Sequence, residues 1–118
     1  MTINQVIMRV DTLKPNAYGD AIKTAWLGEL DGKLGREVLG REETVVYSFP
    51  ENHNDELLVE APYDNLYEHY LYAMIDYANR EIQGYMNSMT FFNQAYSEFR
   101  KAYVRANMPK WDNRVRNL

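Results

Sequence analysis

The chain has 118 residues, a length that fits a single globular domain. Hydrophobic residues make up 46% and charged residues 25%, which excludes a disordered tail, a collagen-like repeat and a membrane-spanning chain. Cysteine is absent, which excludes disulfide scaffolds, cysteine-based zinc sites and thiol catalysis. The first residues lack the basic and apolar regions of a secretory signal, so we expect a soluble protein that is made in the cytoplasm.

The net charge of −4 is unevenly distributed along the chain. Residues 1–99 carry a net charge of −9 and residues 100–118 a net charge of +5, and residues 42–64 hold seven carboxylates without a Lys or Arg. An acidic body argues against tight binding of nucleic acid, because phosphates must be neutralised by basic side chains. A basic tail on an acidic body favours head-to-tail contacts between copies or docking on an acidic partner; the alternative is a solvated loop and a solvated tail.

Two helices are predicted in the first third of the chain. Thr2 and Gln5 have the spacing of a capping box, and apolar residues recur at helical intervals until Pro15 ends the pattern. A second helix is expected from Asp20 to about Val38. Its interior glycines each cost roughly 1 kcal/mol relative to alanine, so this helix needs tertiary support or breaks near Gly32.

Residues 44–60 change character. The run from Thr44 to Phe49 is β-branched and aromatic, residues 57–59 form a second apolar run, and a polar stretch rich in turn-forming residues separates them. This pattern predicts either a short β-hairpin or an extended loop that leans on a neighbouring element.

The dominant element follows Pro62. From Leu71 to Tyr103, apolar residues alternate at spacings of four and three residues without interruption, as in a coiled-coil seam. We predict one long helix over residues 63–107, continuous or mildly kinked near Gly84–Ser88, in preference to two antiparallel helices. The chain is thus expected to be mainly α: a small helical bundle in a single domain over residues 1–109, followed by a basic flexible tail over residues 110–118.

A continuous helix of this length would span roughly 67 Å and protrude from a compact domain. Its apolar seam would then need a second chain to cover it, and tyrosine is enriched at such interfaces. The alternative is a thick core of Tyr and Met within one bundle. The predicted subunit interface comprises Tyr63, Tyr67, Tyr70, Leu71, Ile75, Ile82, Tyr85, Met89, Phe92, Tyr96, Phe99 and Tyr103.

Residue patterns of known catalytic and cofactor sites are not found. His69 has no metal-ligand residue three or four positions away, and the glycines of the second helix lack the context of a phosphate-binding loop. Asp76 and Arg80 read as a surface ion pair. We therefore predict a protein that is not an enzyme and that uses no cofactor or metal.

Three stretches carry a family resemblance. They are Ala25–Lys33 (AWLGELDGK), Leu58–Ile82 with its Pro62-Tyr63-Asp64 core, and Tyr85–Met89 with the residues that follow. Together they resemble small head–tail connector, or neck adaptor, proteins of tailed phages and prophages, over most of the chain from about Leu13 to Pro109. This chain has Gly28-Glu29 where such proteins often have Ser-x-Glu.

The resemblance implies a helical virion protein that is made in the bacterial cytoplasm and assembles as a ring in the virion neck, below the portal. Its implied partners are other copies, the portal protein and a head-closure or tail protein, with passing contact to DNA that is not sequence-specific and no membrane. An acidic channel lining would repel sliding DNA, and a basic tail would dock on the neighbouring ring. The candidate lining residues are Glu42, Glu43, Glu51, Asp55 and Glu56, and the candidate docking residues are Lys110, Trp111, Arg114 and Arg116.

Two other functions stay open. The chain is alternatively a helical protein-binding module outside the virion, such as a prophage regulator or chaperone, which would act as a dimer. It is also compatible with another capsid or tail completion protein, which differs from the adaptor only in its partner.

Overall fold

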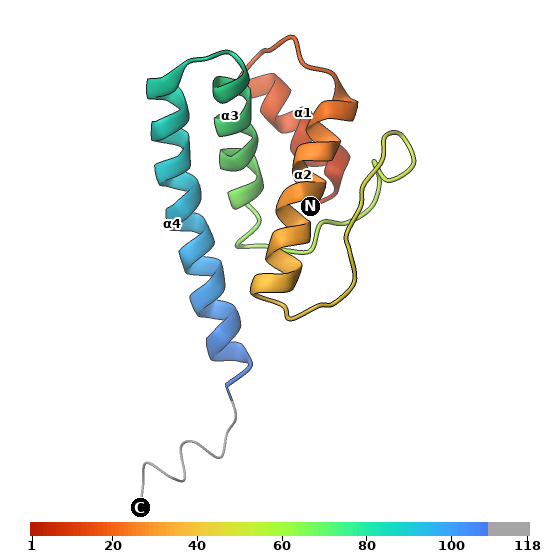
Figure 1. Cartoon of the computed structure of the whole chain (residues 1–118), viewed down its shortest axis with the longest axis vertical. Helices are drawn as coiled ribbons and strands as arrows, with labels where there is room; N and C mark the ends of the chain where they lie inside the picture. Colours follow the sequence, from red (N-terminus) through yellow and green to blue (C-terminus); the bar gives the residue numbers. More distant parts are fainter. Residues whose placement is uncertain (109–118) are drawn as a thin grey trace, which may run out of the picture.

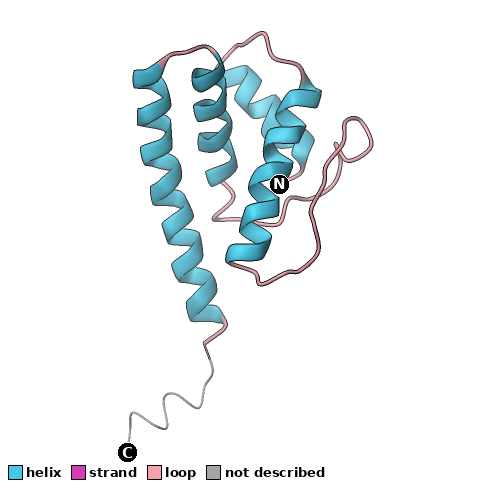
Figure 2. Ribbon diagram, in the orientation of Figure 1, coloured by secondary structure: helices cyan, strands magenta, loops and turns pink. Residues whose placement is uncertain are grey.

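The computed structural model describes residues 1–108, which form a bundle of four helices (Figure 1). The helices are α1 (Ile3–Leu13), α2 (Asp20–Glu37), α3 (Leu66–Ala78) and α4 (Ile82–Ala106). Helices and loops account for all the described residues, without a strand (Figure 2). The prediction of a mainly α bundle with a long C-terminal helix is confirmed.

Helix α1 begins as its sequence predicts. The Thr2 hydroxyl accepts a hydrogen bond from the Gln5 amide at 3.1 Å, and the Gln5 side chain accepts one from the Thr2 amide at 2.9 Å. These reciprocal bonds satisfy two amides that a helix start leaves without intrahelical partners. The helix ends at Leu13, ahead of Pro15, and buries an apolar stripe against the bundle.

Helix α2 runs without a break through its glycines, because neighbouring segments support it. A salt bridge of 2.6 Å between Lys23 and Asp11 ties its first turns to α1, and the Lys23 side chain is almost fully buried. Leu27, Leu30 and Leu34 enter the common core. The predicted alternative, a break near Gly32, does not occur.

The predicted continuous helix over residues 63–107 is wrong, and the alternative of two antiparallel helices is correct. Residues 79–81 reverse the chain between α3 and α4. The Glu81 amide donates to the Asp76 carbonyl at 2.8 Å and the Arg80 amide to the Tyr77 carbonyl at 3.0 Å. These bonds are those of a Schellman motif, with Arg80 in the left-handed conformation (φ 59°) that glycine usually occupies.

The seam of alternating apolar residues explains both the error and the packing. A turn of three residues is close to one helical repeat, so the spacing of four and three continues across it although the chain reverses. The seam therefore folds onto itself: Leu71 and Ile75 of α3 and Phe92 and Phe99 of α4 lie in one core. The face that was predicted to need a second chain is covered largely by the chain itself.

Gly84 of α4 packs directly against the side chain of Asp76 in α3. A Cβ atom at this position would lie 2.6 Å from a carboxylate oxygen of Asp76, a distance that real Cβ contacts do not show. Asp76 is buried and forms a salt bridge of 2.7 Å with Lys14, so its carboxylate has little freedom to move. Gly84 thus allows close helix packing rather than a kink. The predicted surface ion pair of Asp76 with Arg80 is wrong, because Asp76 is buried and pairs with Lys14 instead.

For the segment between α2 and α3 the sequence predicts either a short β-hairpin or an extended loop, and the structure shows the extended loop. Its one contact of β type is an isolated bridge between Thr2 and Glu56. The amides of Ile3 and Asn4 donate to the carbonyls of Asp55 and His53 at 3.1 and 2.8 Å, so the loop also caps the start of α1. Helix α3 then begins at Leu66, three residues after the predicted start.

Replacing Arg80 with glycine tests the turn between α3 and α4. Because a residue with a side chain pays a steric cost at φ 59°, Arg80→Gly is expected to raise the free energy of unfolding by about 0.5–1 kcal/mol in urea titrations. The control Arg80→Ala keeps the left-handed strain and should bring no comparable gain. Equal stabilisation by both variants would contradict the proposed strain.

Candidate functional site

The residues of the predicted interface fall into three classes of exposure. Five are buried in the chain's own core, which corrects their assignment to a contact with another subunit: Tyr67, Leu71, Ile75, Phe92 and Phe99. Six are partly buried: Tyr63, Tyr70, Tyr85, Met89, Tyr96 and Tyr103. Ile82 alone among the twelve is exposed. The aromatic side chains serve first to join α3 and the residues just before it to α4, since Tyr63 packs on Phe99, Tyr70 on Phe92 and Tyr77 on Tyr85.

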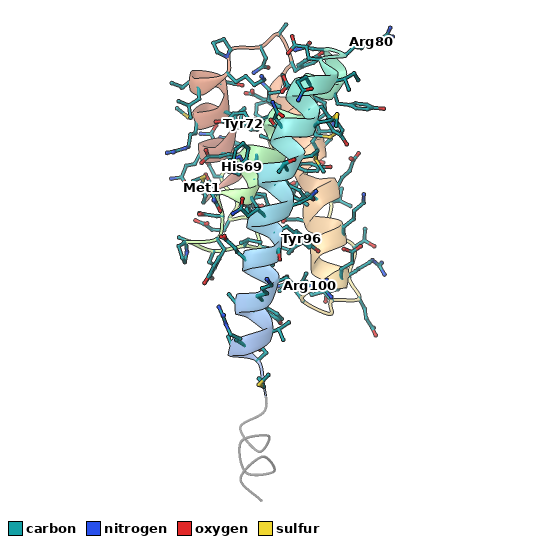
Figure 3. The ribbon with its side chains drawn as sticks, turned by 90° about the vertical axis from the view of Figure 1, so that its left-hand side faces the viewer. Met1, His69, Tyr72, Arg80, Tyr96 and Arg100 are labelled. Carbon is teal, nitrogen blue, oxygen red and sulfur yellow. The ribbon has the colours of Figure 1, made fainter. Side chains whose placement is uncertain are left out.

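The surface that α4 leaves uncovered lies on its opposite side. Ile82, Met86 and Val104 lie on this outer face and are 61%, 56% and 53% exposed. Figure 3 views the molecule from this side, with α4 in front and Arg100 on its lower half. The outer face has no charged residue over its first four turns and is basic towards its end, at Arg100 and Arg105.

The five acidic residues of the candidate channel lining all lie in the extended loop and are exposed, but they do not form one free surface. Glu56 pairs with the amino group of Met1 at 3.0 Å, and Asp55 accepts a hydrogen bond from Asn52 at 2.8 Å. Within residues 1–108, Glu42, Glu43 and Glu51 form no ion pair.

The loop is held against α2 by a buried carboxylate that the sequence analysis did not single out. Asp31 accepts hydrogen bonds from the hydroxyls of Tyr47 at 2.5 Å and Tyr67 at 2.6 Å, and from the Leu58 amide at 3.1 Å. The Tyr67 hydroxyl in turn accepts from the Val59 amide at 2.9 Å. This group, the Asp31 centre, joins α2, the extended loop and α3.

Burial is the largest cause of the pKa shifts in the Asp31 centre. It raises the pKa of Asp31, although the bonds from Tyr47 and Tyr67 act in the opposite direction. Burial also raises the pKa of both tyrosines, and their hydrogen bonds to Asp31 and its charge add to that rise. The side chain of Asp31 is fully buried, so its carboxylate fixes the fold and does not reach a ligand at the surface.

Residues of α2 and of the extended segment line a groove on the surface. Its volume is about 500 Å³, and its walls include Gly28, Lys33 and Arg36 of α2 and residues 44–47 of the loop. A Cβ atom on Gly28 would lie 3.3 Å from the Tyr47 amide nitrogen, whereas one on Gly32 would lie 3.8 Å from the Val45 carbonyl oxygen. The absence of side chains at these positions lets the loop lie directly on the helix.

The described structure also limits which sites the chain offers. Within residues 1–108, no three imidazole, thiol or carboxylate groups gather closely enough to hold a metal ion. Among the described helices, none combines the length and the apolar composition that crossing a lipid bilayer requires. The predicted docking tail, with Lys110, Trp111, Arg114 and Arg116, lies outside the described residues.

One signal in the sequence does point to Asp31. It lies four residues after Leu27 and three before Leu34, in the register of the buried face of α2. A carboxylate at such a position needs hydrogen-bond donors from elsewhere in the fold. The sequence does not say which of the ten tyrosines supply them.

Comparisons of this chain with models of protein families, with curated proteins and with solved structures find no match.

Substitution of two glycines in α2 tests how closely the loop lies on the helix. Gly32→Ala meets only ordinary contacts, so the better helix propensity of alanine should raise the free energy of unfolding by about 0.5–1 kcal/mol. Gly28→Ala should lower it by about 1–2 kcal/mol, because the Tyr47 backbone is fixed by the hydrogen bond to Asp31 and cannot easily retreat. Urea unfolding of both variants measures this; stabilisation by both would contradict the close contact.

Alkaline pH tests the Asp31 centre. A tyrosine whose pKa is raised on folding contributes stability that is complete below its usual pKa of about 10 and is lost as the pH rises further. The free energy of unfolding should thus fall steeply above pH 10, and Tyr67→Phe should make that fall shallower. At pH 7 the same variant should lose about 2–4 kcal/mol, because the Val59 amide and Asp31 both lose a partner. An unchanged alkaline slope in Tyr67→Phe would refute this role.

Proposed function

We propose that this chain is a structural subunit of a phage or prophage virion: a head–tail connector adaptor that assembles as a ring below the portal. The observation that carries the proposal is the outer face of α4. The helix has 25 residues and extends past the end of α2 (Figure 1), and it offers exposed Ile82, Met86 and Val104 to a neighbour. These apolar side chains, at the two ends of the helix face, are available for burial against a neighbouring copy.

The family resemblance supports the proposal from a second direction. Its first block, Ala25–Lys33, contains Asp31, and its second block, which begins at Leu58, contains Tyr67. These two side chains meet in the Asp31 centre, at 2.6 Å. The stretches that resemble connector proteins are therefore those that hold α2, the loop and α3 together.

In this proposal the exposed carboxylate of Glu51 in the loop faces the channel. Its charge would repel the phosphates of passing DNA and keep it from adhering. The basic tail, with Arg114 and Arg116, would dock on the portal or on the next ring. The partners are therefore other copies of the chain, the portal protein and a head-closure or tail protein.

Light scattering coupled to size exclusion, with and without the portal protein of the same phage, tests this function. We expect a stable ring, or a shift to a complex of many copies when portal is added. A plain dimer that is indifferent to portal would overturn the adaptor and favour a helical protein-binding module.

The tail is tested in the same assay. Arg114→Glu with Arg116→Glu should abolish the shift caused by portal, because the reversed charges repel an acidic docking surface. The matched control, Lys33→Glu with Arg36→Glu, changes the net charge equally at exposed positions that form no ion pair within residues 1–108, and should leave the shift intact. Unchanged attachment of the tail variant would remove the tail from the proposal.

A further inference from the structure

Two exposed patches on this chain have opposite charge and a similar build. The acidic segment, residues 42–51, contains Glu42, Glu43 and Glu51 around Val46, which is 72% exposed. The basic face of α4 consists of Arg100, Lys101 and Arg105 around Val104, which is 53% exposed. Each patch thus has an exposed valine near charges that are mainly of one sign, with Arg41 next to the acidic segment and Glu98 about one turn from Lys101 on α4.

Part of the backbone of the acidic segment is also free to bind. Within residues 1–108, the N–H and C=O groups of residues 42–47 form no hydrogen bond with another protein group, and of these the Tyr47 amide and the Val45 carbonyl lie against α2. Other loop amides nearby are paired: Arg41 donates to Gly35 and Ser48 to the Asn52 side chain. Arginine side chains carry several N–H donors, which suit a row of unpaired carbonyls as well as carboxylates.

The two patches lie on opposite flanks of the molecule. In Figure 1, α4 forms the left edge, and the loop between α2 and α3 forms the right edge. Figure 3 looks onto α4 from the left and places Arg100 at the front. Complementary surfaces on opposite flanks cannot meet within one chain, but they can join successive copies in a head-to-tail series.

We propose that copies of this chain bind one another head to tail, with the acidic segment of one copy against the basic face of α4 in the next. Val46 packs against Val104, and the basic side chains bind Glu42, Glu43 and the unpaired carbonyl groups of residues 42–44. Lys33 and Arg36 of α2 line the groove behind the segment, where Arg36 bonds to Thr44 at 3.4 Å. Within residues 1–108 neither basic residue forms an ion pair with Glu42 or Glu43, so these carboxylates remain for the neighbour. This inference rests on the proposed function, because a ring of adaptor subunits needs a head-to-tail contact between neighbouring copies.

Mixing two charge-reversed variants of the full chain tests the contact. Arg100→Glu with Arg105→Glu makes the α4 face acidic, and Glu42→Lys with Glu43→Lys makes the loop basic. By sedimentation at low salt, each variant alone should associate about tenfold more weakly than the unmodified chain, because like charges then face each other. The equimolar mixture should associate again, because each altered patch finds its complement. A mixture that associates no better than either variant alone overturns the proposal.

Cross-linking through introduced cysteines detects the contact even when it is weak. The chain has no cysteine, so Val46→Cys in one preparation and Val104→Cys in another supply the only thiols. Under mild oxidation their mixture should form disulfide-linked heterodimers at least about tenfold faster than either forms homodimers. Ile82→Cys, on the uncharged end of the same helix face, is the matched control and should react slowly with Val46→Cys. Equal rates for Val104→Cys and Ile82→Cys overturn the proposal.

These results separate the contact from the function. Portal-dependent assembly that survives both charge reversals would refute the contact and leave the adaptor standing. Charge-dependent pairing in a chain that ignores portal would establish the contact and refute the adaptor.

Discussion

The carboxylate of Asp31 is withdrawn from water at the point where α2, the extended loop and α3 meet. A buried carboxylate is unfavourable unless donors surround it, and here two tyrosine hydroxyls and a backbone amide do so. Because each donor comes from a separate stretch of chain, the carboxylate is satisfied only in one arrangement of the three. The position of the loop on α2, and with it the acidic surface, follows from this requirement.

Two further buried charges fix the remaining helices in the same way. Lys23 pairs with Asp11 between α1 and α2, and Lys14 pairs with Asp76 where Gly84 lets α4 approach. Such pairs gain little net free energy, since the buried member of each, Lys23 or Asp76, loses its water, but removing its partner leaves that buried charge uncompensated. Their main effect in this bundle is therefore to select one packing among the many that an apolar seam would tolerate.

The sequence was sufficient for the elements whose signals are local. The capping box of Thr2, the helix that follows Asp20 and the mainly α character were all predicted and found. The reversal at Arg80 was missed because neither glycine nor proline marks it and because the apolar spacing runs across it unbroken. The Asp31 centre depends on contacts up to 36 positions apart, which residue patterns do not encode. Without the reversal, the apolar seam is assigned to a neighbour, whereas five of its twelve residues are buried in the chain's own core and six are partly buried.

The reversal between α3 and α4 also bears on how the chain folds. The hairpin closes a loop of three residues, so its two helices can meet at little entropic cost, whereas Tyr67 must find Asp31 across a separation of 36 positions. Contacts near in sequence form fast, and those that close long loops form late. We therefore expect the aromatic hairpin to be the folding nucleus, with α2 and the extended loop docking onto it last. A newly made chain would then hold a formed α4 before its acidic surface has taken shape, and the two patches would not become competent to pair until folding is complete.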